Sequence, residues 1–160
     1  MTCRVGHGYD AHRFAPGRRL ILGGVQIEHP AGLAGHSDAD VAVHAVVDAL
    51  LGASGLGDIG AWFPDDDPAY EGASSLSLLR DVAARLRATG WRVGNVDVTV
   101  VCQEPRLMPY REAMRANLAG ALGVSVDAVG VKATTTEGMG FEGRGEGVAA
   151  EAVCLLERDD

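Results

Sequence analysis

Basic residues are scarce in this sequence, and lysine is almost absent. The chain has 14 Lys and Arg against 22 Asp and Glu, which gives a formal net charge of −8 at pH 7, and its one lysine is Lys132. An acidic surface repels the phosphates of nucleic acids and of anionic lipids. We therefore expect no nucleic acid and no membrane as a partner. A ligand that carries phosphate would need local neutralisation by a metal ion, a helix N-terminus or backbone N–H groups.

Cysteine pairs and long hydrophobic runs are also missing. The cysteines are Cys3, Cys102 and Cys154. Their odd number and wide spacing favour neither a disulfide framework nor a thiolate zinc site. The first residues lack the apolar segment of an export signal, and the longest apolar stretch, 41–51, is interrupted by His44 and Asp48. These features predict a cytoplasmic protein without a membrane span.

The length and composition fit one folded unit. The chain has 160 residues, of which 47% are hydrophobic, and a single core commonly holds about 100 to 200 residues. We expect residues 1–160 to form one domain. All five histidines lie within residues 7–44, an uneven distribution that indicates a functional site near the N-terminus.

The hydrophobic periodicity predicts an α+β domain with the order βββααβαββ. Strands are expected at 3–14, in a hairpin at 19–27 that turns at Gly23-Gly24, and at 93–101, 129–135 and 148–156. Helices are expected from Ser37 to about residue 52 or 55, at 74–89 and at 110–122. Segment 148–156 also fits a helix, but its alternating pattern favours a strand. The order predicts a mixed sheet with the helices on one face.

Three residues could together bind a metal ion. Asp10 and His12 are two positions apart, so on a strand both side chains project from one face, and His44 lies on the first predicted helix. One carboxylate and two imidazoles on two rigid elements leave a fourth position open, as in catalytic zinc sites. Asp40 and Asp48, four residues to either side of His44, are candidates to orient its ring. The spacing alone also fits solvated histidines and aspartates that only cap or solvate the helix.

Two further segments are typical of phosphate binding. His36 and Ser37 stand at the start of the first predicted helix, where free N–H groups favour an anion, although Ser37 also fits a plain N-cap. Residues 132–147 carry three threonines and a glycine-rich loop that could surround phosphate oxygens, while Glu137 holds a hard cation. Residues 138–143 match G-x-G-x-x-G, but only 17 residues follow, too few for a dinucleotide-binding unit.

Several separated motifs occur together along nearly the whole chain. They are GYDAHRF at 8–14, GHSDADVAVHAVVDALL at 35–51, GDIG at 57–60, FPD at 63–65, KATTTE at 132–137 and GRGEG at 143–147. As a set they resemble the 2-C-methyl-D-erythritol 2,4-cyclodiphosphate synthase family. The chain departs from the residues commonest in that family at Tyr9, Ala11, Cys102 and Arg106.

The resemblance implies a homotrimer of ferredoxin-like subunits with an active site at each subunit interface. The substrate would be a small cytidine diphosphate compound, 4-diphosphocytidyl-2-C-methyl-D-erythritol 2-phosphate. Its 2-phosphate would attack the β-phosphorus, form 2-C-methyl-D-erythritol 2,4-cyclodiphosphate and release CMP, a step of the non-mevalonate isoprenoid pathway. The enzyme would be a metal-dependent phosphorus–oxygen lyase.

The resemblance also implies residue roles. The ligands of one Zn²⁺ per site would be Asp10, His12 and His44. Mg²⁺ or Mn²⁺ at Glu137 would bridge the diphosphate, while His36 and Thr135 would stabilise charge in the transition state. Besides these residues, the substrate contacts would come from Ala11, Ser37, Asp58, Ile59, Gly60, Phe63, Pro64, Asp65, Asp66, Asp67, Cys102, Gln103, Glu104, Pro105, Arg106, Leu107, Met108, Ala133, Thr134, Thr136, Phe141 and Arg144.

Two other functions use the same residue types. A metal-dependent phosphohydrolase would use zinc-bound hydroxide on a nucleotide diphosphate and release linear products. A noncatalytic trimeric module could bind a nucleotide or a metal through the same loops. The nature of the products separates the first alternative from a cyclase, and turnover separates the second.

Overall fold

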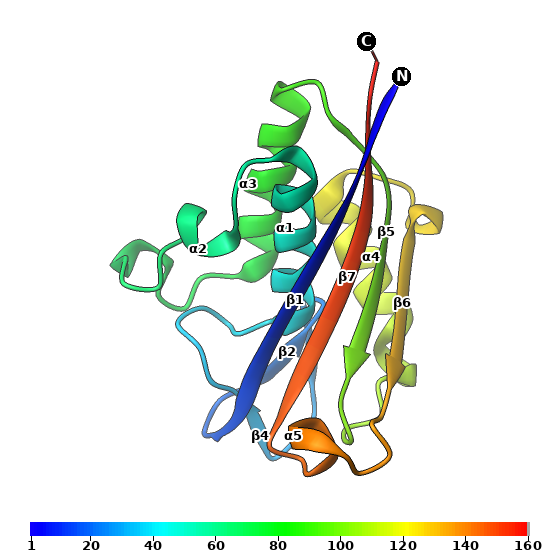
Figure 1. The fold of residues 1–160 in the computed structure, drawn as a ribbon. Coiled ribbons are helices and arrows are strands. Elements are labelled where there is room, and N and C mark those ends of the chain that lie inside the picture. Colours follow the sequence, from blue (N-terminus) through cyan, green and yellow to red (C-terminus); the bar gives the residue numbers. More distant parts are fainter. Residues whose placement is uncertain (160) are drawn as a thin grey trace.

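A five-stranded mixed sheet with helices on one side forms the body of the molecule (Figure 1). The computed structural model describes residues 1–159. The sheet has the order β4-β1-β7-β5-β6, and β2 and β3 form a separate hairpin. The strands are β1 (Thr2–Pro16), β2 (Leu20–Leu22), β3 (Val25–Ile27), β4 (Ala31–Leu33), β5 (Arg92–Val101), β6 (Val129–Thr134) and β7 (Gly147–Arg158). Only β5 and β6 are parallel; the other neighbours in the sheet are antiparallel.

The main helices cover one face of this sheet. They are α1 (Val41–Ser54), α3 (Ser75–Ala88) and α4 (Arg111–Leu122). Short helical turns are α2 (Ile59–Trp62), η1 (Pro68–Tyr70), η2 (Met108–Tyr110), η3 (Val126–Ala128) and α5 (Gly140–Gly143). Figure 1 shows α1 behind β1 and α4 behind β5 and β6. The predicted α+β class, mixed sheet and one-sided helix layer are therefore confirmed.

The alternating strands separate the two faces of the sheet. In β7, Val148, Ala150 and Cys154 are buried against the helices, whereas Glu151 and Val153 on the opposite face are exposed. The same alternation buries one side of β5. A strand is therefore the correct interpretation of 148–156. Within residues 1–159, the main helices leave this face of the sheet open (Figure 1).

The first helix begins later than the sequence pattern predicts. Ala39 adopts a left-handed backbone conformation with φ of 56°, which interrupts any helix that would start at Ser37. Asp40 is the N-cap instead, and its side chain accepts a hydrogen bond from the Val43 backbone N–H. The predicted N-cap role of Ser37 is wrong, because Ser37 lies in the preceding loop.

The other predicted strands and helices agree closely with the structure, whereas the short strand β4 and the turns α2 and η1 were not predicted. The hairpin turns at Gly23-Gly24, both of which have positive φ. The short strand β4 was not predicted, because Pro30 and Gly32 indicate a turn. The loop at 57–72, between α1 and α3, contains the turns α2 and η1. In residues 1–159, no helix combines the length and the apolar character needed to cross a bilayer.

Candidate functional site

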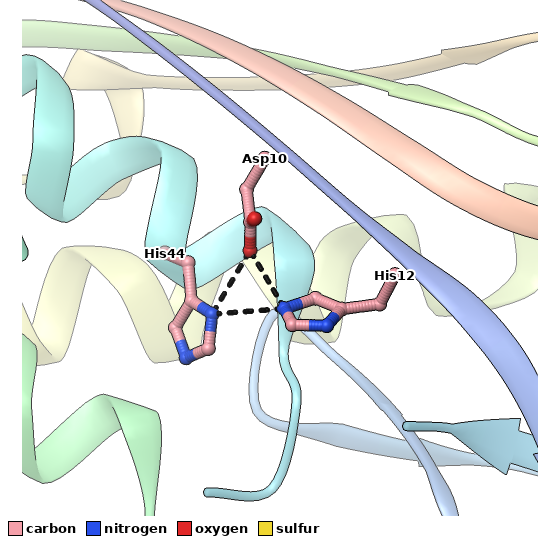
Figure 2. Close-up of side chains that lie close together, drawn as sticks. All are labelled: Asp10, His12 and His44. Carbon is pink, nitrogen blue, oxygen red and sulfur yellow. Dashed lines mark hydrogen bonds and ion pairs between the residues drawn. The ribbon is translucent and has the colours of Figure 1, made fainter. Parts of the chain in front are cut away.

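Asp10, His12 and His44 converge on one point beneath β1 (Figure 2). Asp10 and His12 project from the same face of β1 toward α1, where His44 lies in the first turns of the helix. Asp10 Oδ2 is 2.9 Å from both His12 Nε2 and His44 Nδ1, and the two ring nitrogens are 3.4 Å apart. Within residues 1–159 this is the one cluster of three or more His, Cys, Asp or Glu side chains close enough to share a metal ion.

The donor set fits a zinc ion. Ligand atoms about 2.0 to 2.1 Å from a tetrahedral zinc are about 3.3 Å from one another, close to the observed separations of 2.9 to 3.4 Å. One carboxylate and two imidazoles leave a fourth position for a substrate oxygen, as catalytic sites require. Asp10 and His12 are half-buried, and only 9% of His44 is exposed.

The charges of Asp10 and His12 stabilise each other. Burial alone would raise the pKa of Asp10, but hydrogen bonds from His12 and His44 outweigh it and hold the pKa well below its usual range. Burial lowers the pKa of His12, and the hydrogen bond and charge of Asp10 raise it more, so the net shift is upward. Asp10 is thus anionic at neutral pH and concentrates negative charge where a cation would bind.

The far side of the His44 ring contacts two hydroxyl groups. His44 Nε2 is 2.8 Å from Ser75 Oγ and 3.2 Å from Ser37 Oγ. In the described part of the chain, neither Asp40 nor Asp48 has a hydrogen bond to this ring. The prediction that these aspartates orient His44 is therefore wrong, because both carboxylates accept hydrogen bonds from backbone N–H groups instead.

Asp40 and Asp48 serve backbone N–H groups instead. The Asp40 carboxylate accepts from the N–H groups of Gly23, Gly24 and Val43, and burial raises its pKa to about 6 against these donors. Asp48 accepts from the N–H of Ile59. These carboxylates hold the hairpin and the 57–72 loop around α1.

His36 and the 57–72 loop form one wall beside Asp10, His12 and His44, a group of side chains called the metal cluster below. His36 Nε2 donates to the backbone oxygen of Asp67 over 3.1 Å, and Asp65 lies near enough to His12 to raise its pKa. Asp58 caps α2 through the N–H of Ala61. Phe63 is buried, Pro64 is half-buried, and Asp66 and Gly60 are exposed.

Arg18, which was not predicted as a site residue, holds the segment that carries His36 and Ser37. Arg18 Nη1 donates to the Gly35 carbonyl over 2.8 Å, and Arg18 Nη2 donates to the Ser37 carbonyl over 2.7 Å. Both backbone oxygens flank His36 in the sequence. No sequence pattern marks Arg18, which lies 17 and 19 residues before its partners.

A cavity of about 510 Å³ lies between the β5–α4 loop and β6. Its lining residues are Cys102, Gln103, Pro105, Arg106, Leu107, Met108, Arg111, Met114, Val131, Lys132, Ala133, Thr134 and Thr135. Most of the substrate contacts predicted at 102–108 therefore lie together, whereas Glu104 lines a neighbouring cavity of about 330 Å³ with Arg144. Burial raises the pKa of the Cys102 thiol to about 11, so it stays protonated at neutral pH.

The loop after β6 presents its threonines in a fixed arrangement. Thr135 Oγ1 accepts from the Glu137 N–H over 3.3 Å, while the Thr136 hydroxyl donates to the Met139 carbonyl. The Thr134 hydroxyl donates to the Thr135 carbonyl. Glu137 has a left-handed backbone with φ of 55°. The Thr135 hydroxyl hydrogen is thus free to be donated to a ligand oxygen.

The two groups of site residues do not meet within one chain. The metal cluster lies at β1, whereas Thr135 follows β6, three strands away in the sheet order. At about 4.8 Å per strand this is about 14 Å. Phe141 lies on the β1 side, where it lines a cavity of about 210 Å³ with Ala11 and His12. The predicted site residues of the chain therefore form two separate groups, called half-sites below.

Comparison with known proteins decides the family. The sequence profile of the YgbB family matches residues 3–157. The chain belongs to the YgbB family. The 2-C-methyl-D-erythritol 2,4-cyclodiphosphate synthase of Thiobacillus denitrificans is 61% identical over 155 residues, which cover 97% of each chain. These two matches confirm the predicted family and the predicted synthase function of this YgbB chain.

Solved structures of relatives share the fold. The bifunctional IspDF of Campylobacter jejuni matches with a TM-score of 0.95 and 42% identity over 99% of this YgbB chain. This chain spans 43% of the length of that bifunctional protein. The CDP complex of IspF from Plasmodium falciparum matches with a TM-score of 0.86 and 31% identity, covering 99% of this chain and 97% of the other.

Proposed function

We propose that residues 1–160 form a single cyclodiphosphate synthase domain that works as a cytoplasmic homotrimer. It converts 4-diphosphocytidyl-2-C-methyl-D-erythritol 2-phosphate to 2-C-methyl-D-erythritol 2,4-cyclodiphosphate and CMP. An oxygen of the 2-phosphate forms a bond to the β-phosphorus, and the bond from that phosphorus to the oxygen of the departing CMP breaks. The observation that carries this proposal is the cluster of Asp10, His12 and His44 with donor atoms 2.9 to 3.4 Å apart.

The attacking group needs no strong base. A phosphate monoester is already ionised at neutral pH, so catalysis depends on positioning and on neutralising charge. Asp10, His12 and His44 would hold zinc, which would supply positive charge to polarise a phosphoryl oxygen. Glu137 would hold Mg²⁺ or Mn²⁺ together with diphosphate oxygens, because magnesium is commonly bound by one or two carboxylates plus substrate phosphates.

The chain's own donors act on the developing charge. His36 carries its Nε2 hydrogen toward the Asp67 carbonyl, and a phosphate oxygen in that place would accept the same hydrogen. Ser37 stands beside the metal cluster through its contact with His44. On the other half-site, Thr135 would donate its hydroxyl to a phosphate oxygen, with Thr134 and Thr136 shaping the loop. Preorganised donors of this kind stabilise transition-state charge.

The cavity between β5 and β6 would bind the cytidine portion. Its volume of about 510 Å³ is in the range of small-molecule sites. Gln103, Arg106 and Ala133 among its lining residues offer side-chain and backbone groups for a base and a ribose. The CDP complex of the P. falciparum relative supports a cytidine nucleotide as ligand.

The separation of the half-sites supports a trimer. If the β1 half of one chain faces the β6 half of a second, each interface holds a complete site, and a closed ring satisfies every chain. The open sheet face supports this arrangement, because Val5, Tyr9 and Val153 there are 71%, 49% and 44% exposed. The ferredoxin-like subunit is supported by helices that leave this face bare (Figure 1).

Product analysis tests the function. Purified protein with Zn²⁺ and Mg²⁺ is incubated with the cytidyl substrate, and ³¹P NMR follows the products. We expect CMP and a cyclic diphosphate in equal amounts over many turnovers. Linear phosphate products would instead show a phosphohydrolase, and binding without turnover would show a noncatalytic module.

A further inference from the structure

The imidazole of His44 is held from behind by a chain of hydrogen bonds. Its Nδ1 faces Asp10, and its Nε2 lies 2.8 Å from Ser75 Oγ. Ser75 is fully buried and is the first residue of α3. The Ser75 hydroxyl contacts the Asp38 carboxylate in turn. A residue 31 positions after His44 and a loop residue thus meet behind the ring.

The chemistry of these groups fixes the direction of every bond. An ionised carboxylate only accepts, so the Ser75 hydroxyl donates its single hydrogen to Asp38. Ser75 Oγ can then only accept from His44, which places the hydrogen of the neutral ring on Nε2. When a cation takes the place of the Nδ1 hydrogen that otherwise faces Asp10, the ring keeps its hydrogen on Nε2 and turns the Nδ1 lone pair toward that cation. This is the orientation in which the ring can bind a cation.

Backbone donors fix Asp38 as well. Its Oδ2 accepts from the N–H of Ser75 over 2.9 Å, and its Oδ1 accepts from the N–H of Asp40 over 3.1 Å. Asp38 thereby caps α3 and ties it to the loop before α1. Ser74, the N-cap residue of α3, makes no side-chain capping bond, so this task falls to Asp38.

We propose that Ser75 and Asp38 are positioning residues that hold His44 for metal binding. The inference rests on the zinc site of the proposed function. Groups that fix the second nitrogen of a metal-bound histidine set its orientation and raise its basicity, and their loss commonly costs about 10- to 100-fold in metal affinity. Ser37, at 3.2 Å from the same nitrogen, provides a weaker second acceptor.

The test measures metal affinity rather than turnover. The zinc dissociation constants of the parent chain, Ser75→Ala and Ser74→Ala are compared by competition with a chromogenic chelator. We expect Ser75→Ala to bind zinc about 10- to 100-fold more weakly, and Ser74→Ala to bind like the parent. The visible spectrum of bound Co²⁺, which reports ligand geometry, should change in Ser75→Ala only.

Two more variants keep the inference testable if Ser75→Ala does not fold. Ser75→Thr keeps the hydroxyl and should recover most of the zinc affinity, whereas Asp38→Asn removes the negative charge and should weaken it. Parent-like zinc affinity and Co²⁺ spectra in Ser75→Ala, or in Asp38→Asn where Ser75→Ala does not fold, would overturn the inference. A parent chain that binds no zinc would overturn the metal site itself, so the two failures are distinguishable.

Discussion

Gly8 of β1 lies directly against Ala45 of α1. A Cβ atom built on Gly8 would be 2.0 Å from the Ala45 carbonyl oxygen, far inside van der Waals contact. Gly6 makes the same approach to Ala49, at 1.9 Å. The missing side chains let the strand and the helix pack backbone to backbone. This close packing brings Asp10 on the strand to His44 on the helix.

Gly8→Ala should therefore destabilise the fold and damage the metal cluster together. The added methyl group forces β1 away from α1, and overpacking of this kind costs about 3 kcal/mol. Denaturant unfolding and zinc titration measure the two effects. Gly120→Ala is the control, because Gly120 lies on α4 with open space around it and alanine there favours the helix. Equal stability of the two variants would contradict this packing argument.

His44→Ala should remove the bound zinc and nearly all turnover. The change deletes one of three donors and leaves Asp10 and His12, too few ligands for a stable site. Elemental analysis of the purified variant measures the metal, and CMP release measures activity. His29→Ala, which removes a histidine stacked on Phe14, is a suitable comparison. Full activity in a metal-free His44→Ala protein would contradict the zinc role.

Thr135→Ala should lower kcat while zinc content stays unchanged. The loss of one transition-state donor typically reduces kcat by about 100- to 1,000-fold. Thr135→Ser retains the hydroxyl and should keep most of the rate. Steady-state kinetics with metal analysis check both variants. An unchanged kcat in Thr135→Ala would remove Thr135 from the mechanism.

The buried thiols predict a loss of stability at high pH. Burial raises the pKa of Cys102 and Cys154 from 9.0 to about 11. The folded chain therefore keeps protons that the unfolded chain releases above about pH 9, so stability falls as the pH rises from there toward 11. Urea unfolding across this range measures the slope. A rise in stability over the same range would show that the sign is wrong.

Val153→Glu should disrupt the proposed trimer and lower activity at the same time. The glutamate places a charge on the open face of the sheet, where Val153 pairs with His7 in the register of β1 and β7. Val126→Glu introduces the same charge at a valine that is 39% exposed on η3. Light scattering should show smaller particles for the first variant only. Parent-sized Val153→Glu particles would argue against this face as the interface.

Local patterns were sufficient to predict most elements of the fold. The valine alternation of β5 and the Gly23-Gly24 turn depend on neighbouring residues, and both were predicted correctly. The start of α1 was not, because a left-handed Ala39 depends on contacts of the loop rather than on its own propensity. The four-residue spacing of Asp40 and Asp48 from His44 could not show which N–H groups these carboxylates would meet.

Only the part of the candidate site that lies on a single strand or helix could be predicted from the spacing of residues in the sequence. Asp10 and His12 share a strand face, so their pairing follows from the period of two. The partnership of His44 with Ser75 and Asp38 joins two helices and a loop, and no local pattern encodes it. The same holds for Arg18 and for the gap of three strands between the metal cluster and Thr135.

That gap has a consequence for how the sequence can change. In the proposed trimer, the metal-binding edge of one molecule would face the nucleotide-binding edge of its neighbour, so compatible surfaces would be selected between molecules as well as within one. In a mixed population, a chain defective at one edge would spoil the catalytic centre it shares on that side and leave the other intact. Each polypeptide would thus contribute to two reaction chambers and complete neither alone.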